Sequence, residues 1–356
     1  MFQRIFVPLD GSRRAEDAIP VAARIARASS GIIVLFRAVP SLIDSAWYLL
    51  EPSGRMGYAP VWYPVDPSGR PGYTIDTEVA RAKEYLAMAA RSDDLAGVEM
   101  VTEVVPGDPA HTVLSVAHAQ DADLIVMCSR GETGLKRWLS GSVAQKVARH
   151  SSIPVLVLRE GVERLGDARS AGKRVVRILV PLDESPSAEV ALSPAAQLSV
   201  ALSAPMHGAL HLARILPLPV VEDKEKGEIA RSVRAFALTE ATRYLHAAEQ
   251  QLQTGDAING IPPNMEVTSS VDIDTDIAGR LIGIAENGER REDGSTVEKC
   301  DIIAMATHGR GGVGRWLVGS TAERILSSTR LPLLILRPQK AVAKSPSSHL
   351  DSTLTR

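Results

Sequence analysis

The chain repeats itself, and this constrains its fold more than any other sequence feature. Residues Arg4–Glu16 read RIFVPLDGSRRAE, and residues Arg177–Glu189 read RILVPLDESPSAE. Near the end of each half, IPVLVLR at Ile153–Arg159 corresponds to LPLLILR at Leu331–Arg337. Because the halves correspond in order from beginning to end, we expect a duplicated domain of about 160 residues. Solenoid repeats are far shorter, so a solenoid is not expected.

Polar stretches set the expected domain boundaries. We expect a first domain at 1–160, a linker at 161–173, a second domain at 174–338 and a disordered tail at 339–356. A chain of 356 residues is long enough for a hydrophobic core in each domain. The first half also contains a Pro- and Gly-rich insertion at 40–75, which holds Trp47, Tyr48, Tyr58, Trp62, Tyr63 and Tyr73. This insertion is expected to be a partner surface or a lid, or to pack on its own domain.

Strands and helices are expected to alternate in both halves. Short runs of apolar and β-branched residues predict strands, and the stretches between them have apolar residues at helical spacing. Because the strands are apolar throughout, we predict an α/β fold with an open parallel sheet in each half and helices on both faces. The first half is expected to have strands at 4–9, 32–39, 98–105, 123–127 and 155–158, with helices at 15–28, 77–91, 108–119 and 142–150. The second is expected to have strands at 175–182, 210–216, 265–270, 301–305 and 333–336, helices at 188–201, 230–251, 276–286 and 320–327, and a solvated loop at 287–299.

Composition excludes several classes of function. A net charge of −2 gives no electrostatic reason to expect a nucleic-acid partner. Cys128 and Cys300 are far apart and have no neighbours at metal-ligand spacing, which argues for a reducing compartment without disulfides or a zinc site. The first residues lack the apolar region of a signal peptide, and no apolar run is long enough to span a bilayer. We therefore expect a cytoplasmic protein with no membrane partner.

Two glycine-rich segments are candidates for anion binding. Residues 128–142, CSRGETGLKRWLSGS, and residues 306–320, ATHGRGGVGRWLVGS, are identical at seven of their fifteen positions. Each follows an apolar run and ends where a helical pattern begins. A helix start exposes unpaired N–H groups and partial positive charge, and glycine lets the main chain approach a ligand closely. The alternative is a tight turn that needs glycine for its own dihedral angles, but two copies with the same spacing favour a ligand.

Two familiar nucleotide motifs are excluded. Residues 309–314 match G-x-G-x-x-G, but they follow the penultimate strand of their half, and the twin segment lacks the match. A dinucleotide site would place this motif after the first strand, with an acidic residue about twenty positions on. No acidic residue occurs at 329–336, and no G-x-x-x-x-G-K-[ST] occurs in the chain. Neither a Rossmann dinucleotide site nor a P-loop is expected.

The aspartate of the repeated V-P-L-D sequence is a further candidate. Asp10 and Asp183 each follow the first predicted strand of a half, at the edge of an open α/β sheet where ligands bind. Such a carboxylate could accept hydrogen bonds from ribose hydroxyl groups. It could also cap the following helix, for which Ser12 is a further candidate, and the two roles are compatible.

Together these residues resemble the universal stress protein family over nearly the whole of both halves. ATP-binding members of that family carry the pattern G-x2-G-x9-G-[S/T]. Here it reads Cys128-x2-Gly131-x9-Gly141-Ser142 and Ala306-x2-Gly309-x9-Gly319-Ser320, so a small residue replaces the first glycine in both copies. The resemblance implies two tandem Rossmann-like domains of the adenine nucleotide alpha hydrolase-like type. It also implies a nucleotide-dependent role in stress response or signalling, with ATP as the ligand, with or without Mg²⁺.

The resemblance further implies which residues contact the nucleotide. The phosphates would lie on the loop and the helix start, and the adenine over the ends of the first two strands. In the first half the implied residues are Pro8, Asp10, Ala38, Met127, Cys128, Arg130, Gly131, Gly141, Ser142 and Val143. In the second half they are Pro181, Asp183, Ile215, Met305, Ala306, His308, Gly309, Arg310, Gly319, Ser320 and Thr321.

No catalytic residue is expected at these sites. Asp10 and Asp183 could contact a metal ion, but no side chain is a convincing general base for phosphoryl transfer. His308 corresponds to Arg130 in the other half, so it is not a repeated catalytic feature. We expect a nucleotide-binding module, and a slow ATPase or self-phosphorylating enzyme and an interaction scaffold without nucleotide remain as alternatives.

The two sites are expected to be unequal. Glu132 follows the loop glycine of the first half and would repel a triphosphate, whereas Arg310 at the equivalent position would attract it. Against this, the first half has Gly107-Asp108-Pro109 after its third strand, as is usual in the family, where the second half has Thr275-Asp276-Ile277. The hypothesis is that the C-terminal site binds ATP more tightly.

The last strand of each half is expected to lie at a sheet edge. Both strands are apolar, and an exposed apolar edge is a liability unless it is paired. The family resemblance implies dimerisation through this strand. We therefore expect the two halves to pair as an internal pseudo-dimer, and association into a homodimer is left open.

Overall fold

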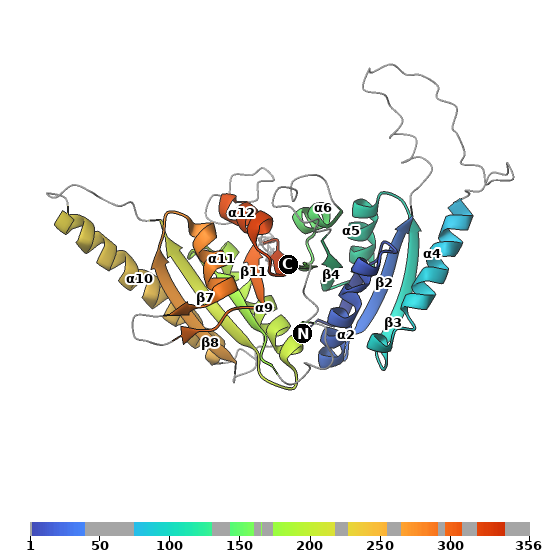
Figure 1. The fold of residues 1–356 in the computed structure, drawn as a ribbon, viewed down its shortest axis with the longest axis horizontal. Coiled ribbons are helices and arrows are strands. Elements are labelled where there is room, and N and C mark those ends of the chain that lie inside the picture. The colour runs from blue at the N-terminus through green and yellow to red at the C-terminus, as the bar shows by residue number, and fades with distance from the viewer. Residues whose placement is uncertain are drawn as a thin grey trace, which may run out of the picture.

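The computed structural model describes residues 2–39, 75–129, 143–159, 165, 174–217, 227–254, 265–290, 296–307 and 319–338. In the first half the strands are β1 (Arg4–Pro8), β2 (Ile32–Val39), β3 (Glu99–Pro106), β4 (Leu124–Cys128) and β5 (Val155–Leu158). In the second half they are β6 (Arg177–Pro181), β7 (Ala209–Leu216), β8 (Glu266–Ile273), β11 (Ile302–Ala306) and β12 (Leu333–Leu336). They form one ten-stranded sheet in the order β3-β2-β1-β4-β5-β12-β11-β6-β7-β8 (Figure 1).

Within each half the strands are parallel, and the halves meet at one antiparallel pair. Leu156 of β5 pairs with Leu334 of β12, with Val157 opposite Leu333 and Val155 opposite Ile335. The other pairs of the ten-stranded sheet are parallel. The expected pairing of the two last strands is therefore present, and it joins the halves into a single sheet.

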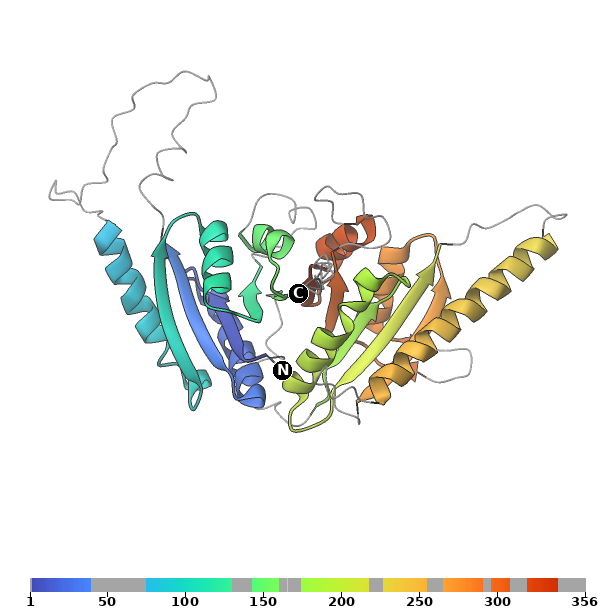
Figure 2. The same cartoon turned by 180° about the vertical axis from the view of Figure 1, so that it is seen from behind.

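Helices cover both faces of the sheet (Figure 2). One face carries α2 (Ala18–Ser29), α4 (Ile75–Ala89), α9 (Leu192–Ser203) and α10 (Gly227–Gln253), and the other carries α5 (Pro109–Ala119), α6 (Val143–His150), α11 (Ile277–Asn287) and α12 (Ser320–Ser328). The strand alternation explains this division, since Ile5 and Val7 of β1 pack in one hydrophobic cluster and Phe6 packs in the other. The predicted α/β fold, with a mostly parallel sheet between two layers of helices, is confirmed.

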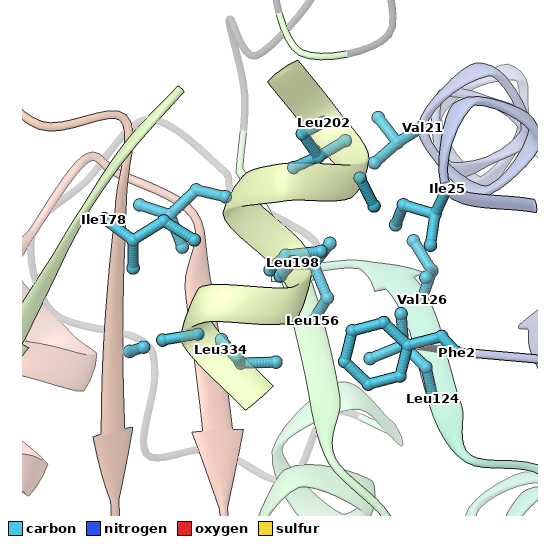
Figure 3. Packing of buried hydrophobic residues seen from close by; sticks show 14 of the residues in the cluster. Phe2, Val21, Ile25, Leu124, Val126, Leu156, Ile178, Leu198, Leu202 and Leu334 are labelled. Carbon is cyan, nitrogen blue, oxygen red and sulfur yellow. The ribbon is translucent and has the colours of Figure 1, made fainter. Parts of the chain in front are cut away.

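The hydrophobic core is continuous between the halves. Figure 3 shows Val21 and Ile25 of α2 opposite Leu198 and Leu202 of α9, above the central strands.

On the other face, Arg159 at the end of β5 donates to the Leu326 carbonyl oxygen of α12. The equivalent arginine of the second half, Arg337, donates to the His150 carbonyl oxygen of α6 at 3.4 Å. Each half therefore caps the last turn of a helix in the other half with a cation, a favourable arrangement at a helix C-terminus.

The first helix of each half is broken after one turn. Where the sequence predicts one helix at 15–28 there are two, α1 (Arg13–Glu16) and α2, and the second half likewise has α8 (Pro186–Glu189) before α9. Pro20 and Pro194 lie in the first turn of α2 and α9. Proline lacks the N–H that would bond four residues back, and its ring clashes with that carbonyl group. The proline therefore ends the preceding turn, and the single-helix predictions were wrong at this point.

Two further differences concern exposed parts of the fold. The segment expected to be a solvated loop, 287–299, contains the antiparallel pair β9 (Glu289–Arg290) and β10 (Thr296–Val297), and Val297 is buried. The outer strands are not apolar throughout: β3 exposes Glu99, Val101 and Thr102, since it lies at the end of the sheet. A short 3-10 helix, η1 (Asp93–Leu95), precedes β3. Residues 40–74, with the aromatic insertion, and the tail 339–356 lie outside the described residues.

Membrane-spanning helices were also considered. Within the ranges given above, no helix combines the length and the apolar character that crossing a bilayer requires.

Candidate functional site

The sheet topology brings the candidate residues of each half to one edge. In the first half β1 lies between β2 and β4, and in the second half β6 lies between β7 and β11. Because these neighbours are parallel, the segments that follow β1 and β4 leave the sheet side by side, as do those that follow β6 and β11. The aspartate turn and the start of the glycine segment are thus adjacent in both halves, as expected from the sequence.

The two aspartates make the same turn. Asp10 Oδ1 accepts hydrogen bonds from the Ser12 N–H at 2.9 Å and the Ser12 hydroxyl group at 2.5 Å. Asp183 Oδ1 accepts from the Ser185 N–H at 3.0 Å and the Ser185 hydroxyl group at 2.5 Å. The helix caps are therefore the serines, Ser12 for α1 and Ser185 for α8, and not the aspartates. Each aspartate instead orients its capping serine, while its carboxylate remains at the edge of the sheet.

The two positions expected to contact adenine are level with these aspartates. Pro8 pairs with Phe36, and the Leu9 N–H donates to the Phe36 carbonyl oxygen at 2.7 Å. Ala38 follows Phe36 by two residues in β2, and Asp10 follows Pro8 by two residues, just beyond the end of β1. In the second half Pro181 pairs with Ala213, and Ile215 and Asp183 each follow by two residues, with Asp183 beyond the end of β6. Both apolar side chains pack on the face that carries α5 and α11.

The strands before the glycine segments end in small, partly exposed residues. Met127 and Met305 are buried on the α5 and α11 face, whereas Cys128 and Ala306 are partly exposed at the ends of β4 and β11. Burial raises the pKa of the Cys128 thiol to about 12, and the Asp17 carboxylate adds to the effect. A raised pKa keeps this thiol protonated near neutral pH and so disfavours a role as a thiolate nucleophile.

Metal ligands do not cluster in the part of the chain that the structure describes. There, no group of three or more His, Cys, Asp or Glu side chains is placed to hold a metal ion.

The start of α12 carries the clearest information about the glycine segments. The Gly319 N–H donates to the Thr307 carbonyl oxygen at 3.2 Å, so the residues on either side of 308–318 are joined. Gly319 precedes α12 with φ −56° and makes no side-chain cap, and Ser320 beside it is also exposed. Side-chain caps begin α1, α5, α8 and α11, whereas α2 and α9, like α12, begin without one. The first N–H groups of α12, which include that of Thr321, are therefore available to an acceptor from outside the described protein atoms.

Glycine at position 319 is not explained by the backbone. A φ of −56° is open to any L-residue, and a Cβ added to Gly319 meets no described atom within 4 Å. Gly208 is the opposite case, since an added Cβ would lie 2.8 Å from the Ser199 carbonyl carbon. The alternative that glycine serves its own dihedral angles therefore does not account for Gly319.

Several predicted site residues lie outside the described residues, so the structure does not place them. They are Arg130, Gly131, Gly141, Ser142, His308, Gly309 and Arg310. The comparison of Glu132 with Arg310, which suggested unequal sites, falls in the same segments. Val143 is described and begins α6.

A repeated cluster of polar side chains was missed by sequence reasoning. Behind each aspartate turn, an arginine of the second strand lies over a tyrosine of the outer helix, and that tyrosine donates to a glutamate of the first short helix. The clusters are Arg37, Tyr85 and Glu16 in the first half, and Arg214, Tyr244 and Glu189 in the second. Comparison of the two halves at charged positions outside the glycine segments would have found them.

Comparison with known proteins places the chain in a family. The sequence model of the universal stress protein family matches residues 1–159 and 296–337, which is more than half of the chain. The chain belongs to the universal stress protein family. The universal stress protein YxiE of Bacillus subtilis is 30% identical over 162 residues, which cover 45% of this chain and 100% of that protein. A universal stress protein of Methanocaldococcus jannaschii is 45% identical over 64 residues, covering 18% of this chain and 38% of the relative.

A solved structure supports the fold of the whole chain. The crystal structure of a universal stress protein from Archaeoglobus fulgidus aligns with 94% of this chain and 96% of its own, with a TM-score of 0.55 and 19% sequence identity. At this identity the likeness concerns the fold alone. It covers both halves of this universal stress protein, in agreement with the ten-stranded arrangement.

Proposed function

We propose that this universal stress protein binds an adenine nucleotide at the carboxyl edge of each half and acts as a nucleotide-dependent module in stress response or signalling. ATP is the proposed ligand, with or without Mg²⁺, and the cytoplasm is the proposed location. The proposed domains are 1–160 and 174–338, one site in each. The site residues are those named in the sequence analysis, of which the described ones lie at the two edges.

The observation that carries the proposal is Gly319. This residue begins α12 without a side-chain cap, its φ does not require glycine, and an added Cβ meets no described atom. Because the described residues do not require glycine here, the proposal accounts for it by a ligand that approaches the main chain closely. Asp183 lies at the same edge, where its carboxylate would accept hydrogen bonds from ribose hydroxyl groups.

Titration of ATP against matched glycine variants tests the proposal. Gly319→Val is expected to weaken ATP binding at the second site at least tenfold in isothermal titration calorimetry, because the added side chain occupies the space of the phosphates. The matched control is Gly283→Val in the middle of α11, where an added Cβ also meets no described atom, and its affinity should equal that of the wild type. Equal affinity of Gly319→Val and wild type would contradict the proposal.

The same titration tests the inequality of the sites. If the C-terminal site binds ATP more tightly, Gly319→Val should remove the tighter binding step and Gly141→Val the weaker one. A larger loss from Gly141→Val would refute this ordering.

Two alternatives are distinguished by simple measurements. Phosphate release well above background, lost on substitution of His308 or Asp183, would favour a slow ATPase. Absence of nucleotide from protein denatured directly after purification, together with no heat of ATP binding, would favour an interaction scaffold.

A further inference from the structure

An arginine lies directly behind each aspartate turn. Arg37 of β2 and Arg214 of β7 hold the same place in their strands, one residue before Ala38 and Ile215. Successive residues of a strand point to opposite faces, so the arginines point toward α4 and α10 and away from the proposed adenine position. Arg214 is only 9% exposed, so its charge is largely withdrawn from water.

Each arginine is held by an aromatic ring of the outer helix. The Arg37 guanidinium carbon lies 4.8 Å from the ring centre of Tyr85, and that of Arg214 lies 5.9 Å from the ring centre of Tyr244. These are cation–π distances. The outer helices α4 and α10 are thus tied to the strand that flanks each proposed site.

The tyrosine hydroxyl groups extend the connection to the helix after the turn. Tyr85 donates to Glu16 Oε1 at 2.9 Å, and Tyr244 donates to Glu189 Oε1 at 2.8 Å. Glu16 and Glu189 are the last residues of α1 and α8, the one-turn helices that Ser12 and Ser185 cap. Burial, and secondarily the glutamate, raise the pKa of both phenols well above the usual tyrosine value, so the hydroxyl groups remain donors.

Both arginines also contact the residue between aspartate and serine. In the first half this is Gly11 with φ +87°, and an added Cβ would lie 2.8 Å from Arg37 Nη1. In the second half it is Glu184 with φ +63°, whose Oε1 lies 3.1 Å from Arg214 Nη2. A glutamate at positive φ is unfavourable, and such residues persist where their surroundings hold them. The ion pair with Arg214 is one surrounding contact that holds Glu184.

We infer that Arg37 and Arg214 are positioning residues for the two nucleotide sites: each fixes its aspartate turn against α4 or α10, so that Asp10 or Asp183 faces the ligand. The role in ligand binding rests on the proposed function, whereas the fixing of the turn does not. The two turns are fixed differently. Arg37 packs against the bare main chain of Gly11, and Arg214 holds a charged partner.

Arg214→Gln is the test variant, because glutamine cannot stack on Tyr244 as a cation or pair with Glu184. Arg177→Gln is its matched control. Arg177 is 8% exposed, and its Nη2 lies 2.9 Å from Glu266 Oε1, but it begins β6 at the edge opposite the proposed site. Both variants remove one buried arginine from the same half, and the control removes at least as much ion pairing, because Arg177 also lies 3.9 Å from Glu298 Oε2.

Two readouts are measured in a Gly141→Val background, so that nucleotide binding reports the second site. The first is ATP affinity by calorimetry, and the second is hydrogen exchange of the Ser185 amide, whose N–H donates to Asp183. Arg214→Gln is expected to lower the affinity for ATP at least tenfold and to increase the exchange rate of the Ser185 amide at least tenfold. Arg177→Gln should leave both within twofold. Unchanged affinity and exchange in Arg214→Gln, or an equal loss in Arg177→Gln, would overturn the inference.

The two proposals fail in different ways. If the wild-type protein binds no ATP, the proposed function fails, while faster Ser185 exchange in Arg214→Gln still supports fixing of the turn. If Arg214→Gln does not fold, Glu184→Gln decides the matter, because it removes the carboxylate that pairs with Arg214 and leaves the arginine in place. At least threefold faster Ser185 exchange in Glu184→Gln supports the inference, and unaltered exchange overturns it.

Discussion

The antiparallel pair at the centre of the sheet predicts that the two halves unfold together. Leu334 of β12 is fully buried, lies opposite Leu156 of β5 and belongs to a hydrophobic cluster that spans both halves. Leu334→Ala removes three carbon atoms, a loss of about 2.4 kcal/mol at about 0.8 kcal/mol for each buried group. The cavity left behind adds to this, so we expect about 3 kcal/mol, within the range of roughly 2.7–5.0 kcal/mol known for such changes.

Hydrogen exchange with mass spectrometry measures this effect in each half separately. A loss of about 3 kcal/mol raises the globally unfolded population roughly 100-fold, since 1.4 kcal/mol corresponds to a factor of ten. The exchange rates of the slowest amides in β1 and β2 should therefore increase by about the same factor as those in β6 and β7, relative to the wild type. Met88→Ala on the exposed side of α4 is the control and should change stability by less than about 0.5 kcal/mol. If Leu334→Ala accelerates exchange only in β6 and β7, the halves unfold independently and the reasoning is wrong.

Three other predictions follow from described contacts. Ser185→Ala removes the cap of α8 and should lower the free energy of unfolding by about 1 kcal/mol in urea titrations. Ser185→Thr should retain most of the wild-type stability, and an equal loss in both variants would argue against capping. Gly208→Ala should destabilise the protein by about 1–3 kcal/mol, because the added Cβ meets main-chain atoms. Gly283→Ala lies in open space within α11 and should stabilise the protein by about 0.5–1 kcal/mol. A stability change of the same sign in both variants would contradict this prediction. Burial raises the thiol pKa of Cys128 and Cys300 to about 12 from 9.0, so the folded state holds these protons more tightly than the unfolded state. The stability that this supplies is present below pH 9 and lost as pH rises toward 12, so the urea midpoint should fall above pH 9, and native thiols should not react with a disulfide reagent at pH 8. The raised thiol pKa would be refuted if the urea midpoint of the wild type stays constant above pH 9 while that of a Cys128→Ala, Cys300→Ala double variant falls.

The sequence predicts the strands well because apolar runs are both short and clearly bounded. The expected ranges 32–39, 155–158 and 333–336 are the observed β2, β5 and β12. Errors arose where a local signal was outweighed by its surroundings. Pro20 and Pro194 break the first helices, and Val297 is buried within a segment whose other residues are mostly polar.

The candidate site was predictable only in part. Parallel strand order follows from the repeated pattern of strands and helices, and it places Asp10 and Asp183 at the carboxyl edge of the sheet. The contacts of Arg37 with Tyr85 join residues of β2 and α4 that are far apart along the chain. Such contacts depend on how helices pack on the sheet, which periodicity does not specify. The repeat itself was the available signal, because Arg214 and Tyr244 form the same contact in the second half.

The antiparallel pairing of β5 with β12 within one chain has a consequence for how this protein can evolve. In a dimer of identical chains every substitution appears twice, so a residue that suits one site is imposed on the other. Here both partners are parts of one chain, and each position can vary alone. Gly11 and Glu184 are an example. They occupy the same position of the turn, but Gly11 has no side chain, whereas Glu184 forms an ion pair with Arg214. Fusion therefore allows one half to specialise while its twin maintains the shared sheet.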